Sequence, residues 1–598
     1  MAAALRESPQ LKVMGRRGGR GRSHQVEASG TGQTGRRRPG RPGWVGIALA
    51  LVTVVAVVGM VGVAIAMNPG GASPGSAVSL DPGTSTGTGP VAASIASSSA
   101  SPATSASAAA AAATPTPPAA AASLSPAAGP GAASVPLVVV SGFDNYAVTS
   151  VTRAGLTTRL TAGTLIVPCG AEAELAKALG TPGRTAVACV PADQVTARLG
   201  PTSTLLALLP PALVTPRVKV VPLEGADLFG EKPARSVAYP LVIATPAAWP
   251  AAWSAWRGTD VRVIVTTGVN CPDRGVSHQT VVLGKGWDWL LKGGTARYTG
   301  THWDPGFGWT VVDAVRTDHA GALTALIRNA DVAVSDFECA MTRSFVQHDS
   351  GTVFSIDPRV APLMAKAGFD VATIAADHTT NAGLGPVGET VDLFRANGIQ
   401  PTGAGRTLAE ALRPAIVDAG GTTFGFVGFD AIGGSAYATT SSAGVAALTP
   451  ANVRTAVARA RALGAQVVIA LPQWSSVEYR AQFTAFQQGI VGTLFAAGVD
   501  HIVGADFHWA GALAVSLAGS TYRYVGSSQG NFWFGQDWSR QTQEGIITSL
   551  TFVGTRLAQV RLTPTVILDN AQPNLVDPAT DGQFVLRQVL SGTTLPAK

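Results

Sequence analysis

The sequence predicts an α/β protein: a large layered α/β domain with a largely parallel sheet in its core, preceded by a small α/β domain and a membrane anchor. Short buried strands alternate with helical patterns after residue 260, a shorter set of such strands begins near residue 136, and an uncharged apolar run lies near the N-terminus. With 598 residues and 46% hydrophobic content, the chain can bury more than one core.

The basic character of the chain is confined to its N-terminal end. The formal net charge is +7, but residues 1–43 hold nine Arg and one Lys against two Glu, so the rest of the chain is close to neutral. A clustered basic surface is the electrostatic footprint of nucleic-acid binding. We therefore expect no nucleic-acid partner for the folded part.

The N-terminal region predicts a single-pass membrane protein. Residues 1–43 lack apolar periodicity and are expected to form a disordered, basic cytoplasmic tail. Residues 44–67 form an uncharged apolar run of about the length that spans a bilayer as a transmembrane helix. Arginines precede this run and no positive cluster follows it, which places the N-terminus in the cytoplasm and the later domains outside.

A cleaved signal peptide is the alternative to this anchor, with Ala64–Ala66 as its cleavage site. The apolar region of a signal peptide usually has only about 7–15 residues, which favours the uncleaved anchor. Residues 68–135 are mostly Ala, Ser, Pro and Thr, and predict an extended linker. We expect this linker to hold the extracytoplasmic domains away from the cell membrane.

Residues 136–257 are predicted to form the small α/β domain. Cys169 and Cys189 each lie at a strand end, where they form either a disulfide, as secreted proteins do, or two buried free thiols. The domain contains no group of residues typical of catalysis, so we expect it to bind a ligand or pack against the next domain. Its strands are expected at 137–140, 164–167, 185–190, 218–221 and 241–244, and a helix at 171–179.

Residues 258–570 are predicted to form the large layered domain, and residues 571–598 a C-terminal tail. Strands are expected at 261–266, 332–334, 371–375, 423–428, 467–471 and 501–503. Helices are expected at 357–367, 387–396, 450–463 and 481–497, and a β-rich closing section at 522–562.

The segment Gly368–Gly405 is central to the functional prediction. It contains a buried strand, a turn with Asp377 and His378, and a helix that ends near Asn397. Open α/β sheets bind ligands at the carboxyl ends of their strands, so this turn is a candidate site. An Asp that caps a helix beside a solvated His is the structural alternative.

Polar residues also follow other predicted strands. If the strands are parallel, their carboxyl ends lie at one edge, where carboxylates and imidazoles can converge on a cation. The segments are 267–274, 335–339, 376–378, 471–479 and 504–508.

The order of these segments resembles that of the CapA family of poly-γ-glutamate capsule synthesis proteins, which has the calcineurin-like metallophosphoesterase fold. The blocks that carry the resemblance are 267–269, 336–342, 368–405, 471–479, 504–508 and 528–534. The resemblance covers about half of the chain. It implies a layered α/β/β/α sandwich and a role in the synthesis, export or attachment of an anionic envelope polymer, in contact with polymer synthesis or export proteins.

The sequence departs from the family pattern at several expected ligands. The family's first Asp is Val269 here, the His of its H-W-G motif is Gln473, and the first His of G-H-x-P-H is Asp506. The resemblance leaves Glu338, Asp377, Asp506, Gln473 and His508 as metal ligands. Because this set is rich in oxygen, it favours magnesium, manganese or calcium over zinc.

The resemblance also implies a mechanism of metal-assisted hydrolysis or transfer, in which a divalent cation polarises the scissile group and His378 acts as general acid. Arg274 would neutralise charge on an anionic substrate, or form a surface salt bridge. The alternative is a catalytically inactive relative that has lost its metal and binds a polymer or serves as a scaffold of the cell envelope.

Two further groups of residues leave alternatives open. The tryptophans near the predicted strand ends either stack on a sugar or peptide substrate or pack in the core. Cys271 and Cys339 follow two neighbouring strands, where a disulfide is conceivable. The tryptophans are Trp474, Trp509, Trp533 and Trp538.

Overall fold

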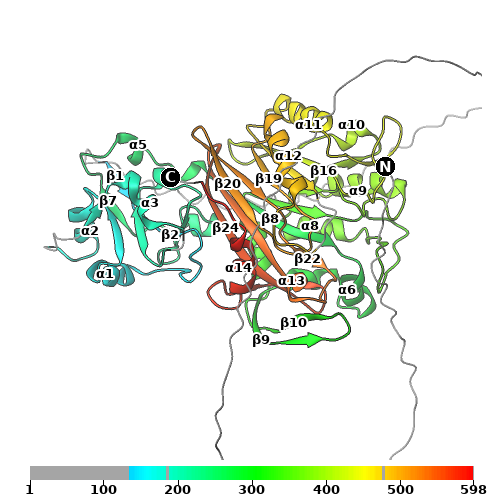
Figure 1. Cartoon of the computed structure of the whole chain (residues 1–598), viewed down its shortest axis with the longest axis horizontal. Coiled ribbons are helices and arrows are strands. Elements are labelled where there is room, and N and C mark those ends of the chain that lie inside the picture. Colours follow the sequence, from blue (N-terminus) through cyan, green and yellow to red (C-terminus); the bar gives the residue numbers. More distant parts are fainter. Residues whose placement is uncertain (1–132, 183–187, 202, 475–478, 597–598) are drawn as a thin grey trace, which may run out of the picture. The chain divides into compact units, whose positions relative to one another are not determined.

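A computed structural model describes residues 133–182, 188–201, 203–474 and 479–596 (Figure 1). The chain divides into two units, residues 1–120 and 121–598, and all described residues belong to the second. The predicted cytoplasmic tail, the transmembrane segment 44–67 and the linker up to residue 132 lie outside the described residues. No helix among the described residues has the length and apolar character needed to cross a membrane.

The first part of the described chain forms a five-stranded sheet with the strand order β4-β3-β5-β2-β6. The central strand β5 was not predicted from the sequence. The Cys169–Cys189 disulfide joins the residue after β3 to β4. The strands are β2 (Val138–Gly142), β3 (Leu165–Pro168), β4 (Cys189–Val190), β5 (Leu206–Leu209) and β6 (Val218–Val220), and the main helices are α1 (Arg153–Thr161), α2 (Glu172–Ala178) and α3 (Val195–Leu199).

Two larger sheets form most of the remaining described chain. The first has the order β10-β9-β25-β24-β23-β8-β11-β12-β13, and β22 also pairs with β8. Its strands are β8 (Val261–Cys271), β9 (Thr295–Asp304), β10 (Trp309–Arg316), β11 (Val332–Phe337), β12 (Val371–Thr373), β13 (Gln400–Thr402), β22 (Asn531–Phe534), β23 (Glu544–Val553), β24 (Arg556–Leu568) and β25 (Gln572–Val576).

The second large sheet has the order β15-β16-β18-β19-β21-β20. Strands β8, β11, β12 and β13 of the first sheet are parallel, as are β16, β18, β19 and β21 of the second. The strands of the second sheet are β15 (Ala415–Asp418), β16 (Thr423–Asp430), β18 (Val467–Gln473), β19 (His501–Val503), β20 (Leu513–Ala518) and β21 (Thr521–Gly526).

The buried hydrophobic clusters show how the two large sheets and their helices are layered. One face of each sheet contributes to a shared core, in which Val332 and Val334 of β11 join Phe424 and Ile469 of the second sheet. The opposite face of the first sheet packs against α7 (Ala322–Asn329), α8 (Val360–Ala367) and α9 (Leu384–Ala396). The opposite face of the second packs against α10 (Leu408–Ala411), α11 (Pro450–Ala462) and α12 (Ala485–Ala496). This is a layered α/β/β/α arrangement.

The mixed α/β fold with parallel strands at its centre is therefore confirmed. Strands β8, β11 and β18 extend beyond their predicted ends, to Cys271, Phe337 and Gln473. Polar residues that the sequence suggested were in turns, including Asn270 and Asp336, thus belong to strands. Both of these side chains are buried.

The segment predicted as a C-terminal tail, residues 571–598, is part of this fold as far as it is described, to residue 596. Strand β25 pairs with β24 and β9, and α14 (Gln583–Ser591) buries Val585, Leu586 and Val589 in the core between the sheets. The apolar residues of α14 recur at helical spacing, which explains why this face is buried.

We expect Leu586→Ala to lower the free energy of unfolding by about 2–5 kcal/mol, because it leaves a cavity beside the inter-sheet core. Denaturant unfolding of the purified protein measures this change. Arg587→Ala on the exposed side of α14 is the control and should change stability by no more than about 0.5 kcal/mol. Equal effects of the two substitutions would show that α14 does not contribute to the core.

Candidate functional site

Gln473, at the end of β18, connects the strand ends of the two large sheets. Its side-chain Nε2 donates to Glu338 Oε1 (3.1 Å), and its Oε1 accepts from the backbone N–H of Asp377 (2.8 Å). Glu338 follows β11, and Asp377 lies in the turn after β12. Three of the predicted site residues are thus in direct contact where the two sheets meet.

Glu338, Asp377 and His378 form a group that could hold a metal ion. One carboxylate oxygen of each acidic residue and one imidazole nitrogen lie within 4.8 Å of one another. Glu338 is buried, and the side chains of Asp377 and His378 are about one-fifth exposed. Two carboxylates and one imidazole on neighbouring strand ends are a suitable set of ligands for a divalent cation.

The hydrogen bonds around His378 define its tautomer. Asn381 Oδ1 accepts from the backbone N–H of Phe354 (3.2 Å), so this atom is an acceptor. His378 Nδ1 lies 2.9 Å from the same oxygen and must therefore carry the hydrogen. In the neutral ring the lone pair is then on Nε2, which lies 3.5 Å from Asp377 Oδ2. This orientation suits either metal ligation or proton transfer at Nε2.

A glycine allows a neighbouring loop to approach Asp377. A Cβ at Gly434 would lie 2.8 Å from the Asp377 carbonyl oxygen, closer than side-chain atoms approach. The next residue, Ser435, donates from Oγ to this oxygen (2.8 Å) and accepts from the backbone N–H of Thr380 (2.9 Å). The backbone of the turn is therefore held on both sides of His378.

Two further acidic side chains, Asp336 and Asp430, are buried in this region. Burial, and to a lesser extent the nearby Asp377, raise the pKa of Asp336 to about 7. The pKa of Asp430 is raised to about 6, because burial and Asp377 raise it more than backbone hydrogen bonds from Ile432 and Gly433 lower it. Asp336 Oδ2 is buried and has no hydrogen-bond partner among the described residues. Such an arrangement favours a bound cation.

Asp336 and Asp430 were not among the predicted site residues. Asp336 is the penultimate residue of β11, two residues before Glu338. Asp430 is the last residue of the buried strand β16. Both therefore show the strand-end pattern that identified the other residues.

Asp506 and His508 lie after β19 in a strained turn. Both have positive φ, 109° and 55°, which is uncommon for residues other than glycine. His508 Nδ1 lies 2.9 Å from Asn531 Oδ1, and its ring stacks on Phe534 with a centroid distance of 5.2 Å. Neither residue belongs to the group formed by Glu338, Asp377 and His378.

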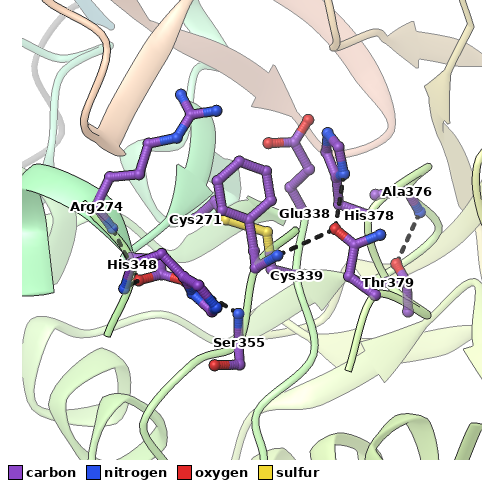
Figure 2. The surroundings of a disulfide bond; sticks show 12 residues. Cys271, Arg274, Glu338, Cys339, His348, Ser355, Ala376, His378 and Thr379 are labelled. Carbon is purple, nitrogen blue, oxygen red and sulfur yellow. Dashed lines mark hydrogen bonds and ion pairs between the residues drawn. A yellow bond between two sulfur atoms is a disulfide. The ribbon is translucent and has the colours of Figure 1, made fainter. Parts of the chain in front are cut away.

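Arg274 packs against aromatic rings near the two histidines. Its guanidinium carbon lies 4.7 Å from the centroid of Phe354, 5.5 Å from that of Phe534 and 5.8 Å from that of Trp538. Phe354 makes an edge contact with His378 at 4.7 Å. Figure 2 shows Glu338 and His378 on one side of the Cys271–Cys339 disulfide and Arg274 on the other.

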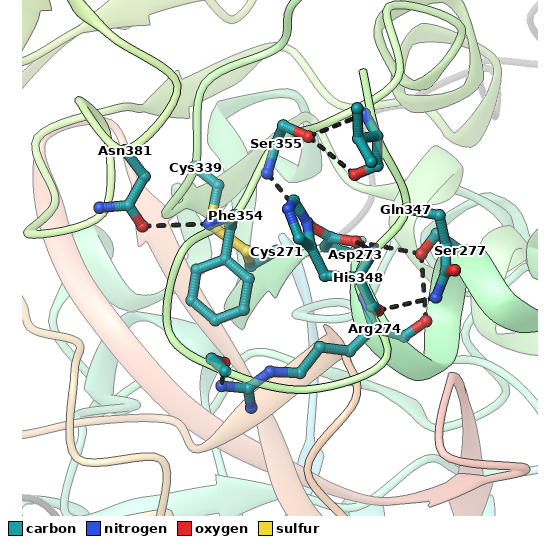
Figure 3. A network of polar contacts seen from close by, with 12 residues as sticks. Cys271, Asp273, Arg274, Ser277, Cys339, Gln347, His348, Phe354, Ser355 and Asn381 are labelled. Carbon is teal, nitrogen blue, oxygen red and sulfur yellow. Dashed lines mark hydrogen bonds and ion pairs between the residues drawn. A yellow bond between two sulfur atoms is a disulfide. The ribbon is translucent and has the colours of Figure 1, made fainter.

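Asp273 organises the loop that carries Phe354 (Figure 3). Its buried carboxylate accepts from the backbone N–H groups of His348 (3.0 Å) and Ser355 (3.0 Å), and lies 2.6 Å from His348 Nδ1. Asn270 donates to Ser335 Oγ (3.0 Å) and to backbone oxygens. These contacts support the neighbouring loops and strands.

The alternatives are decided for the cysteines and for two of the four tryptophans. All four cysteines form disulfides, Cys169–Cys189 and Cys271–Cys339. Trp474 and Trp533 are fully buried core residues, whereas Trp509 and Trp538 are partly exposed. Ser475 and Glu478, which belong to the predicted 471–479 motif, lie outside the described residues.

These features define a layered α/β protein with a carboxylate-rich candidate metal site at the junction of its two large sheets. Residues 288–536 match the family model described as "Bacterial capsule synthesis protein PGA_cap". Capsule biosynthesis protein CapA of Bacillus anthracis is 24% identical over 294 residues, 48% of this chain and 70% of that protein. The resemblance to the CapA family is therefore confirmed, and the matched residues include every predicted metal ligand.

Three solved structures show weaker similarity. NAD nucleotidase (NadN) of Haemophilus influenzae has 12% identity and a TM-score of 0.29, over 56% of this chain and 57% of its own. A 5'-nucleotidase precursor of Thermus thermophilus has 14% identity and a TM-score of 0.30, over 55% and 58%. Calcineurin-like phosphoesterase YfkN of Bacillus subtilis has 14% identity and a TM-score of 0.26, over 55% and 98%. This chain thus spans little more than half the length of the first two proteins. The TM-scores of all three are too low to establish a shared fold.

The raised pKa of Asp336 predicts how stability depends on pH in protein freed of metal by a chelator. The folded state keeps a proton on Asp336 that the unfolded state loses near pH 4, so the contribution of this carboxyl to stability is fully present below about pH 4 and is lost as pH rises to about 7. Asp336→Asn removes the group whose deprotonation lowers stability. At pH 8 the variant should therefore be more stable than the unchanged protein, by on the order of 2–4 kcal/mol.

Denaturant unfolding at pH 5 and pH 8 measures the difference. Asp349→Asn, at an exposed carboxylate, is the matched control. If Asp336→Asn raised the free energy of unfolding equally at both pH values, or if the control showed the same gain, Asp336 would not be a buried, protonated carboxyl.

Proposed function

We propose that the chain is a membrane-anchored, extracytoplasmic CapA-like protein that acts on an anionic envelope polymer of the poly-γ-glutamate type. The observation that supports this proposal most directly is the convergence of Glu338, Asp377 and His378 within 4.8 Å, in the segment that matches the capsule synthesis family. The reaction would be hydrolysis or transfer at a metallophosphoesterase-like site.

The residues of the site fit a divalent cation. Two carboxylates and one imidazole converge, and the buried Asp336 adds a carboxylate oxygen that has no hydrogen-bond partner among the described residues. Because oxygen atoms predominate, magnesium, manganese or calcium suits the set better than zinc. When bound, the cation would polarise a phosphoryl or acyl oxygen and stabilise the negative charge that develops on it.

The chain's own side chains would orient the substrate and move a proton. Asn381 holds the His378 ring through Nδ1, so Nε2 can deliver a proton to the leaving group. The same Nε2 cannot ligate a cation and carry a proton at once, and the two roles predict different metal contents after substitution. Arg274, held on Phe354 and Phe534, supplies a positive charge for an anionic substrate.

The proposed location outside the cytoplasm has support from the cysteines. All four are paired, and disulfides are rare in reducing cytosol but common in exported proteins. The charge pattern around residues 44–67 supports the same orientation, with the N-terminus in the cytoplasm.

A catalytically inactive, polymer-binding relative is the second candidate. Gln473 already connects Glu338 to the Asp377 backbone through hydrogen bonds, which lets the strand ends meet without a metal. Val269, at the position of the family's first Asp, is fully buried and offers no ligand. These two observations favour loss of one metal position.

We expect the purified protein to retain about one divalent cation per chain, and Glu338→Gln and Asp377→Asn to reduce this content at least tenfold, because each removes a charged ligand. Elemental analysis after native purification measures the metal. His378→Ala should abolish cleavage or transfer of poly-γ-glutamate; if His378 is the acid, it should leave the metal content unchanged.

Asp392→Asn, at an exposed carboxylate on α9, is the control and should keep both metal and activity. The enzymatic proposal would be contradicted if the purified protein held no metal and either had no activity or kept its activity in Glu338→Gln, Asp377→Asn and His378→Ala. Metal-independent binding of poly-γ-glutamate would then support the polymer-binding alternative.

A further inference from the structure

A cavity of about 150 Å³ lies between β6 of the five-stranded sheet and β24 of the first large sheet. A hydrogen bond from the backbone N–H of Val220 to Gln559 Oε1 (2.6 Å) joins these two strands beside it. The lining, within the described residues, includes none of the residues of the candidate metal site. A cavity of this volume admits a molecule of about the size of benzene.

Lys219, on β6, lines this cavity although it is only 5% exposed. Its Nζ donates to the carbonyl oxygen of Asn145 and lies 3.7 Å from the centroid of the Tyr146 ring. In the described part of the chain no carboxylate forms an ion pair with this ammonium group. Burial and, to a lesser extent, the charge of Arg561 lower the pKa of Lys219 to about 7, against a smaller opposing effect of Asp144. A buried ammonium group that lacks an adjacent counter-ion is costly to the folded protein.

Arg561 is the second cation of the lining, and it lies on β24. Its Nη2 pairs with the buried carboxylate of Asp227 and donates to the carbonyl oxygen of Val220 (3.2 Å). No Asp or Glu is among the described residues that line the cavity. Because Asp227 balances the charge of Arg561, the ammonium group of Lys219 is the positive charge that a ligand can neutralise.

The remaining lining limits the kind of anion that fits. Val148, Pro222, Leu562 and Pro578 present apolar side chains to the cavity. Inorganic phosphate would leave this apolar surface uncovered and would carry more negative charge than one ammonium group balances. A neutral apolar molecule would leave the ammonium group unpaired. An organic acid with one carboxylate and an apolar body satisfies both parts of the lining, by charge-assisted hydrogen bonds and by apolar burial.

We propose that this cavity binds an organic monocarboxylate, whose oxygens accept from Lys219 Nζ and the Arg561 guanidinium and whose apolar body packs against Leu562. Free organic acids and the carboxylate groups of a polymer share this chemistry. The ligand would contact both β6 and β24, so its binding stabilises the junction between these strands. The inference goes beyond the proposed function, because Lys219 and Arg561 lie outside residues 288–536 and the cavity requires neither a bound cation nor turnover.

The test is titration of the purified full-length chain with benzoate, followed by calorimetry and by the Tm of thermal unfolding. Benzoate suits the volume of the cavity, and benzamide is its uncharged counterpart of the same shape. We expect saturable benzoate binding that raises the Tm, and benzamide binding that is weaker by roughly tenfold or more. Lys219→Met should weaken benzoate binding by roughly tenfold or more and stay folded, because it removes a buried charge and keeps an unbranched side chain. Lys366→Met, at an exposed lysine on α8, is the matched control and should not change binding.

The proposal would be overturned if benzoate did not bind, if benzamide bound equally well, or if Lys219→Met bound benzoate as tightly as the unchanged protein. Displacement of benzoate by inorganic phosphate would assign the cavity to inorganic anions and would also overturn it.

Competition titrations with poly-γ-glutamate and with 4-methylpentanoate distinguish the two sources of the carboxylate. Displacement of benzoate by poly-γ-glutamate identifies the carboxylates of a polymer, and displacement by 4-methylpentanoate alone identifies a free acid; each supports the proposal. Displacement by neither would contradict a monocarboxylate site. Circular dichroism confirms that each variant is folded, and the metal content of the protein tests the proposed function separately.

Discussion

Several carboxylates are buried where the two large sheets end, and the electrostatic cost of holding them close together determines what this part of the molecule can do. Asp377 raises the pKa of both Asp336 and Asp430, whose pKa values burial has already raised. The protein can lower this cost by protonation, by hydrogen bonds or by a cation. Gln473 supplies hydrogen bonds, and the convergence of Glu338, Asp377 and His378 suits a cation.

The surrounding structure keeps these side chains in position by contacts that are independent of any metal. The Cys271–Cys339 disulfide joins the ends of β8 and β11, directly beside Glu338. Asp273 fixes the loop that brings Phe354 against His378. Asn381 and Asn531 orient the two histidines through Nδ1. These hydrogen bonds at Nδ1 leave Nε2 of each imidazole available for metal ligation or proton transfer.

The sequence was sufficient to predict the α/β class and the positions of the central strands along the chain, because buried parallel strands are apolar runs between helical patterns. It also identified Glu338, Asp377, His378 and Gln473, which the structure brings together. It could not show that β9 and β10 form a hairpin with exposed aromatics, because their alternation of polar and apolar residues is weak. Nor could it show that residues 572–591 belong to the core, since the pairing of β25 and the packing of α14 depend on distant residues.

Titration of the metal-free protein with Mn²⁺, followed by electron paramagnetic resonance, tests most directly whether the carboxylates at the sheet junction hold a divalent cation. The arrangement of Glu338, Asp377 and His378 predicts about one Mn²⁺ bound per chain, and loss of that binding in Glu338→Gln. If Mn²⁺ does not bind, or binds equally well to Glu338→Gln, the sheet junction is a hydrogen-bonded structural site and not a metal site.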